Sequence, residues 1–172
     1  MNLTDYYKQR CDLQGHNKEV HKEIRRLLKE CDTYEELDVM EGSALAAVLL
    51  ENPTSIQAVG NLETYNKVKH YFEDYAKENN ILFEVFDADP TNCRLNPADL
   101  LLIGGCCTVD QLTQTLNLHG PTAQKYIILR NTTLFPELKQ VAINYGKKTN
   151  RWVFTNEGTD LAGFISLQQF SR

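Results

Sequence analysis

Two cysteines stand where an α/β protein usually does its chemistry. Cys106 and Cys107 follow the apolar run "DLLLIGG" at 99–105, and Thr108 with Gln111 makes a capping box for the helix that comes next. A thiol at a helix N-terminus has a lowered pKa, so it could serve as a nucleophile or as a ligand for a soft metal. A nucleophile also needs a base, and no histidine is close in sequence. The alternative is a pair of small residues packed under a turn.

A second polar pair follows the next apolar run, "KYIILRN" at 125–131. An arginine at the carboxyl end of a buried strand points toward the crevice in which open α/β sheets bind ligands. Arg130 could therefore hold an anionic ligand, or it could form an ion pair with Asp38 or Asp99. With Cys107 and Asn131, it completes the set of catalytic candidates.

Strand and helix patterns alternate along the chain. The apolar spacing predicts helices at 17–31, 41–52, 62–80, 108–119 and 135–148. Strands are expected at 33–40, 55–61, 81–89, 99–105 and 125–131, with two more within 151–167. This order favours an α/β, Rossmann-like three-layer sandwich with a seven-stranded, mostly parallel sheet and an antiparallel C-terminal edge hairpin. We expect one domain over 1–172, with 1–16 as an N-terminal extension.

Composition narrows the classes of partner. The 172 residues carry a net charge of −5, which argues against nucleic acid as the main ligand. The one basic cluster, "HKEIRRLLK", is interpreted as a solvated helix face. No apolar run reaches the roughly 20 residues that span a bilayer, and the start does not resemble a secretion signal. With five cysteines and no CxxC pair, we expect a cytoplasmic protein with reduced thiols and no membrane partner.

The order of elements resembles the class I S-adenosylmethionine-dependent methyltransferase fold. "EELDVMEGSALAAVLLENP" is similar to its first motif, in which a glycine turn leads from a strand into a helix. "ADLLLIGGCCTVDQLTQTLNLHG" followed by "KYIILRNTTLF" resembles a branch of metal-dependent methyltransferases related to cephalosporin hydroxylases. "NRWVFTNEGTDLAGFISL" also fits, so the resemblance covers about residues 5–168.

The resemblance implies where the cofactor would bind. The positions that match are Glu36, Asp38, Glu41, Gly42, Gly60, Asn61, Asp87 and Gly104. Several depart from the family pattern. Asp38 replaces a glycine, and Gly60 or Asn61 replaces the acidic residue that holds the cofactor ribose.

The metal positions depart in the same way. Gly104 replaces an aspartate, Cys107 a histidine, and Arg130 with Asn131 a His-Asp pair. Because hard divalent cations prefer carboxylate oxygens, we expect no metal. Asp87 and Asp89 are interpreted as a solvated loop entry.

We also expect weakened binding of S-adenosylmethionine, since an amide replaces the charged ribose acceptor. Glu63 is an alternative acceptor, although a place in the first turn of a helix explains it as well.

Three functions remain open. The first is a degenerate methyltransferase-fold protein that acts by binding a small molecule or a partner, with a homodimer as one option. The second is an active S-adenosylmethionine-dependent methyltransferase with a small-molecule or sugar acceptor. The third is chemistry at the Cys106 and Cys107 thiols. All three require that Asp38, Gly60, Gly104 and Arg130 meet at the carboxyl edge of one parallel sheet.

Overall fold

The computed structural model describes residues 1–13, 18–132, 134–154 and 163–167. The helices are α1 (Leu3–Leu13), α2 (Lys18–Leu27), α3 (Ser43–Leu49), α4 (Lys69–Glu78), α5 (Val109–His119) and α6 (Glu137–Thr149), with 3-10 turns at Tyr65–Lys67 and Gly120–Thr122. The strands are β1 (Thr33–Leu37), β2 (Ser55–Gly60), β3 (Leu82–Asp87), β4 (Ala98–Ile103), β5 (Ala123–Leu129), β6 (Arg151–Phe154) and β7 (Gly163–Leu167).

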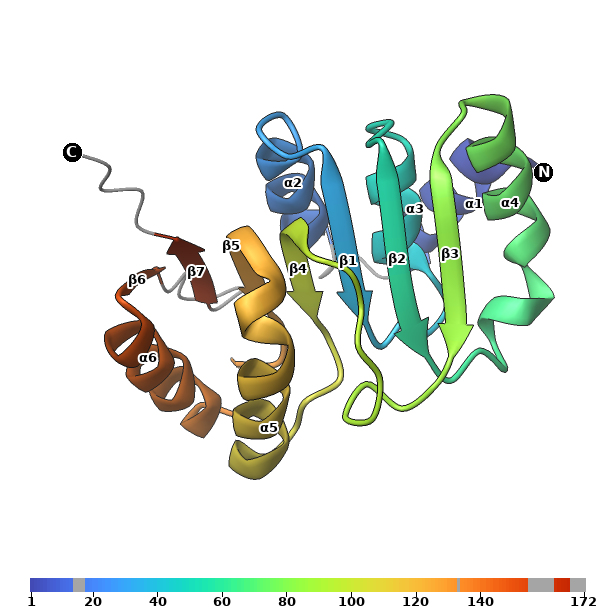
Figure 1. The fold of residues 1–172 in the computed structure, drawn as a ribbon. Helices are drawn as coiled ribbons and strands as arrows, with labels where there is room; N and C mark the ends of the chain where they lie inside the picture. Colours follow the sequence, from blue (N-terminus) through green and yellow to red (C-terminus); the bar gives the residue numbers. More distant parts are fainter. Residues whose placement is uncertain (14–17, 133, 155–162, 168–172) are drawn as a thin grey trace.

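One sheet runs through the molecule in the order β3-β2-β1-β4-β5-β7-β6 (Figure 1). Its parallel part consists of β1 to β5, and β7 pairs antiparallel with both β5 and β6. The order reverses between β1 and β4, which is where ligands bind in open α/β sheets. The α/β Rossmann-like class with a parallel sheet is thus confirmed. The expected C-terminal hairpin turn falls on 155–162, outside the described residues.

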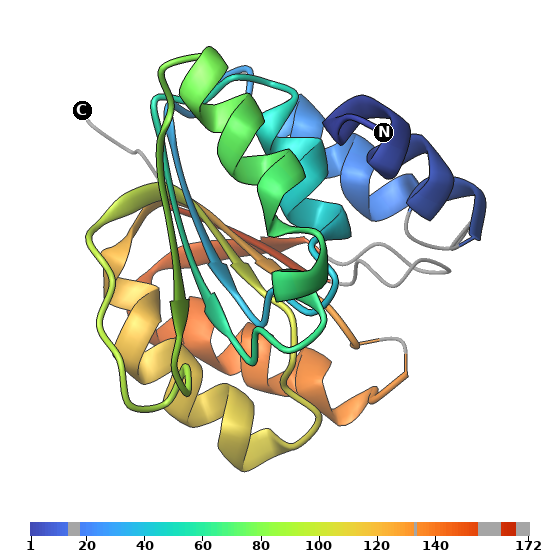
Figure 2. The ribbon, with the colours of Figure 1, turned by 90° about the vertical axis from the view of Figure 1, so that its right-hand side faces the viewer.

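Helices cover the two faces of the sheet unequally. Helices α1 to α4 form one layer and α5 and α6 form the other, as Figure 2 shows. Helix α3 lies at the centre of the larger layer, and all seven of its residues are buried. Strand β4 is buried on both faces along its whole length, in keeping with its continuous apolar sequence.

Two segments differ from the sequence expectation. Residues 1–16 were expected as an extension, but α1 packs against α3 and α4 and buries Leu3 and Tyr6 in the main core. The helix expected at 62–80 is divided, because a 3-10 turn at Tyr65–Lys67 precedes α4. The capping box of α5 is confirmed: the Thr108 hydroxyl accepts from Gln111 N.

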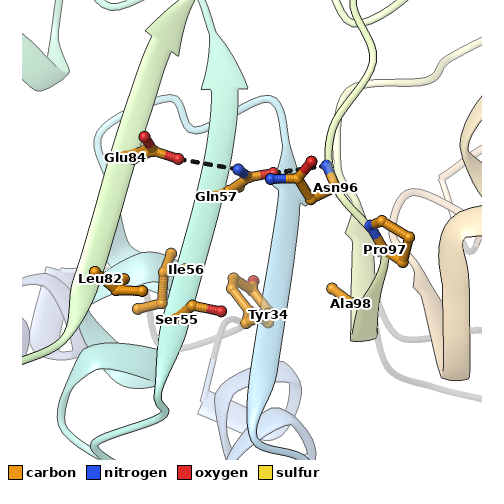
Figure 3. A pocket seen from close by; sticks show the side chains of 9 residues that line it. All are labelled: Tyr34, Ser55, Ile56, Gln57, Leu82, Glu84, Asn96, Pro97 and Ala98. Atoms are coloured by element: carbon orange, nitrogen blue, oxygen red, sulfur yellow. Dashed lines mark hydrogen bonds between the residues drawn. The ribbon is translucent and has the colours of Figure 1, made fainter.

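The crossover from β3 to β4 has no helix, unlike the two crossovers before it. Residues 88–97 instead run across the sheet face that β2 and β3 expose. Gln57 holds them there: its side chain donates to Glu84 (2.9 Å) and accepts from Asn96 N (2.8 Å) beside a cavity of 170 Å³ (Figure 3). Leu82 remains 73% exposed on this face.

His119 also holds the crossover at 88–97, through a hydrogen bond to Pro90. This residue of the last turn of α5 is buried and donates to the Pro90 carbonyl (2.6 Å), and its Nδ1 lies 3.6 Å from a Glu35 oxygen. Burial lowers the pKa of His119, but its bonds to Glu35 and Pro90 outweigh burial and raise that pKa above its ordinary value. The imidazolium form suits this site because it donates to the Pro90 carbonyl and places a positive charge beside Glu35.

Among the described helices, none combines the length and apolar character that a membrane span requires.

Candidate functional site

The ends of β1, β2, β4 and β5 meet at one edge of the sheet. Backbone hydrogen bonds continue the sheet just past the strands: Asp38 N to Val59 O (2.8 Å), Gly104 N to Leu37 O (3.1 Å) and Arg130 N to Ile103 O (3.0 Å). The structure therefore brings Asp38, Gly60, Gly104 and Arg130 together, as the sequence analysis expects. We call this the carboxyl edge, defined by residues 38–42, 60–61, 104–107 and 130–131.

The turn after β1 has an unusual backbone. Asp38, Met40 and Gly42 alternate in the left-handed region, with φ of 74°, 51° and 81°. This region favours glycine, and a side chain such as methionine is strained there. The left-handed conformation of Met40 could not be predicted from the sequence, because the single glycine at 42 does not indicate that two further positions share its conformation.

The Asp38 side chain lies over Gly105. A Cβ added at Gly105 would stand 1.1 Å from Asp38 Oδ2, so only glycine fits beneath this carboxylate. Burial raises the pKa of Asp38, and the nearby Asp89 carboxylate raises it further. The space between the ends of β1 and β4 is thus occupied by the protein's own carboxyl group.

Gly60 ends β2, Asn61 follows it, and the two have separate roles. A Cβ at Gly60 would lie 2.9 Å from Val39 N, so no acidic residue fits at this position without a backbone shift. Asn61 Oδ1 accepts from Glu63 N at 3.0 Å, which ties up the amide oxygen in its own turn. Both Asn61 and Glu63 are exposed.

Glu36 is buried in β1 just below the edge. Its Oε2 accepts from the Tyr34 hydroxyl at 2.9 Å. Burial raises the pKa of Glu36 to about 8, against the lowering effects of the Tyr34 bond and the Arg130 charge. Arg130 therefore acts on Glu36, and the expected alternative with Asp99 is wrong, because Asp99 lies at the opposite end of β4, where it accepts from Asp32 N.

Glu41 and Gly42 complete the turn against the helical layer. The Tyr6 hydroxyl donates to the Glu41 carbonyl, and Ser43 Oγ donates to Glu41 Oε1 at 2.9 Å. A Cβ at Gly42 would lie 2.8 Å from the Phe72 ring. Aromatic residues of α1 and α4 therefore hold this part of the turn in place.

The two cysteines have different surroundings. Cys106 is partly buried, its Sγ lies 3.5 Å from Thr115 Oγ1, and burial raises the pKa of its thiol. Cys107 is exposed, and its backbone N–H donates to the Gln111 side chain at 3.0 Å.

The Asn131 side chain connects the end of β5 to the end of β4. It has a φ of 66°, and its Nδ2 donates to the Gly104 carbonyl at 2.8 Å and to that of Cys106 at 3.4 Å. The side chain expected as a catalytic candidate thus holds the end of β4 to the end of β5.

Asp87 and Asp89 are exposed beyond β3. Hydrogen bonds from Thr91 N and Oγ1, both 2.8 Å, lower the pKa of Asp89. Within the described ranges, no three or more histidine, cysteine, aspartate or glutamate side chains are grouped as a metal site would require.

Among the buried polar atoms without a hydrogen-bond partner in the described residues are His21 Nε2 and Tyr65 Oη, which belong to the helical layer. Burial and the Arg130 charge lower the pKa of His21 to about 4. No sequence signal separated these side chains from ordinary helix residues.

The fold is shared with solved methyltransferase structures, although no protein-family model and no curated protein matches the sequence. A Staphylococcus aureus protein assigned as a caffeoyl-CoA O-methyltransferase has 13% identity and a TM-score of 0.66, covering 94% of this chain and 99% of that one. The methyltransferase domain of bacterial CtHen1 has 14% identity and a TM-score of 0.64, covering 88% and 100%. The SAH-bound Podospora anserina methyltransferase PaMTH1 has 10% identity and a TM-score of 0.61, and the match covers 86% of this chain and 76% of that one. The chain therefore has the class I methyltransferase fold.

Proposed function

We propose that the protein uses the methyltransferase fold as a scaffold for binding a ligand or partner and does not carry out metal-dependent methyl transfer. The position of the Asp38 carboxylate over Gly105 carries the proposal. In this fold the crevice at the carboxyl ends of the strands is where a ligand approaches the backbone. Here a charged side chain stands in that crevice.

The residues at the edge do not fit S-adenosylmethionine well. A ribose diol is held by a carboxylate, and Gly60 cannot be replaced by one because Val39 N is too close. The neighbouring Asn61 oxygen already accepts a hydrogen bond from Glu63 N. A neutral acceptor is also weaker than a charged one by about 1 kcal/mol or more.

The second candidate is an active S-adenosylmethionine-dependent methyltransferase with a small-molecule or sugar acceptor. The SAH-bound neighbour PaMTH1 supports it, as does the left-handed Gly42 that remains in the turn. The two candidates differ in one measurable property, the affinity of the carboxyl edge for the cofactor.

Titration of the purified protein with S-adenosylhomocysteine, followed by melting temperature and calorimetry, separates them. A ligand at 100 times its dissociation constant stabilises by about 2.7 kcal/mol, roughly 5–10 °C for a chain of this size. We expect no such shift for the wild type. Asp38→Gly, which clears the crevice and suits the left-handed backbone, is expected to gain affinity by about tenfold.

Met40→Gly is the matched control, because it also places glycine at a left-handed position but leaves the Asp38 carboxylate where it is. It should not change the affinity. Clear stabilisation of the wild type by S-adenosylhomocysteine, together with an unchanged dissociation constant in Asp38→Gly, would overturn the proposal and favour the active enzyme.

A further inference from the structure

An open cavity of 590 Å³ lies along α2, away from the carboxyl edge. Five cationic side chains line it: Lys18, Lys22, Arg25, Arg26 and Lys29. The residues of α2 that enter the core are on its other side, so these cations face the cavity or solvent. From the sequence, the stretch "HKEIRRLLK" was interpreted as a solvated helix face. The structure adds that these cations line a cavity.

The charge of this cavity is opposite to that of the whole chain. Among the lining residues that the structure describes, the carboxylates are Glu23 and Glu51, so five cations against two anions give these residues a charge of +3, whereas the chain carries −5. Glu51 pairs with Arg25, and Glu23 accepts from Arg26 Nε at 2.6 Å. Across the part of the chain that the structure describes, Lys18, Lys22 and Lys29 have no ion-pair partner.

Contacts within the chain hold the Arg25 side chain in the wall of the cavity. The Arg25 guanidinium lies 6.0 Å from the centre of the Tyr7 ring, and its ion pair with Glu51 fixes it from the other side. Burial is the main cause that raises the pKa of Tyr7 to about 12, so the phenol stays neutral beside an anion. An aromatic face and a fixed guanidinium thus lie next to three ammonium groups.

We propose that this cavity binds a small, multiply charged anion of the phosphate-ester or polyphosphate class, held by Lys18, Lys22 and Lys29. Lysine ammonium groups bind phosphate as point charges, and pockets of several hundred cubic ångströms suit ligands of this size. The volume of the cavity suits a small molecule, and the net charge of −5 on the chain disfavours a nucleic-acid duplex or an anionic membrane surface. The cavity is separate from the carboxyl edge, so this inference does not depend on the proposed function.

Calorimetric titration with inorganic tripolyphosphate in about 0.15 M salt tests the site. Binding by the wild type is expected to weaken about tenfold in Lys22→Glu, which reverses one of the three ammonium charges. Lys69→Glu is the matched control, because it makes the same charge change at an exposed lysine in the first turn of α4. It should change the affinity less than about twofold.

Three results would overturn the proposal. Equal losses in Lys22→Glu and Lys69→Glu would mean that only the overall charge attracts the anion. No binding of tripolyphosphate by the folded wild type would leave the cavity without this ligand class. Citrate binding as tightly as tripolyphosphate would exclude selectivity for phosphate. Circular dichroism of each variant establishes that it is folded.

Discussion

The carboxyl edge and the α2 cavity differ in whether their polar groups have partners within the chain. At the edge, the protein's own atoms occupy the positions that a ligand would use: Asp38 covers Gly105, Asn131 donates to Gly104, and Asn61 accepts from its own turn. In the cavity, cations outnumber carboxylates and three lysines have no ion-pair partner within the described structure. We therefore propose that the protein's own side chains fill the fold's usual ligand crevice, and that an anion binds instead in the helical layer.

The titration of Glu36 gives the largest expected effect on this comparison. A carboxyl group whose pKa is raised on folding stabilises the fold fully only below its unfolded pKa, and that stability is lost as the pH rises through the folded value. Wild-type stability should therefore decline between about pH 4.5 and 8 on account of Glu36. Glu36→Gln removes this decline and keeps an acceptor for Tyr34, so above pH 8 it should be more stable by up to about 5 kcal/mol.

Urea unfolding of both proteins from pH 4 to 9 measures this difference. Folding lowers the pKa of His21 to about 4, so His21 acts in the opposite direction between about pH 4 and 6.5, but equally in both proteins. Glu63→Gln, at an exposed position two residues beyond the edge, serves as the control. A difference between wild type and Glu36→Gln that stays flat across this range would mean that the edge is open to water, and the comparison would fail.

Gly105→Ala tests the closed edge by geometry. The new methyl group would meet Asp38 Oδ2, and we expect a loss of about 1–3 kcal/mol in the free energy of unfolding. In the Asp38→Gly background the same substitution should cost much less. If the two changes are additive in a double-mutant cycle, the carboxylate does not lie where the structure places it.

Met40→Gly gives the smallest effect. Release of the left-handed strain, less the entropy that glycine gains in the unfolded chain, should stabilise by about 1 kcal/mol. Asn80→Gly is the comparison, since Asn80 has a φ of 56° and asparagine tolerates this region. Equal gains from the two substitutions would show that Met40 is not strained.

The positions of the strands were predictable, and the contacts between them were not. Apolar runs and turn residues locate β1, β2, β4 and β5, so Asp38 and Arg130 could be assigned to one edge from sequence. The charge of Arg130 acts on Glu36, and the burial of Glu36 arises from the layer of helices packed on the sheet. The pairing of His119 with Glu35 joins residues 84 positions apart, and no periodicity reports such a pair.

Neither the packing of helix α1 nor the α2 cavity could be predicted, because both depend on contacts between helices. Helix α1 has a weakly amphipathic sequence, so the burial of Leu3 and Tyr6 follows from α3 and α4 and not from its own pattern. The lysines of α2 were visible in the sequence, but the concavity between them and Tyr7 requires the packing of two helices. Local patterns identify elements, whereas surfaces shared by two elements need coordinates.

The exposed side chains of β3 affect the behaviour of the protein at high concentration. Strand β3 is a free border of the sheet and presents Leu82 and Phe86 to water, and Glu84 stands between them. A charge at such a border discourages strand-to-strand association between molecules. Replacing this carboxylate by an uncharged side chain, as in Glu84→Gln, will therefore favour self-association at high concentration.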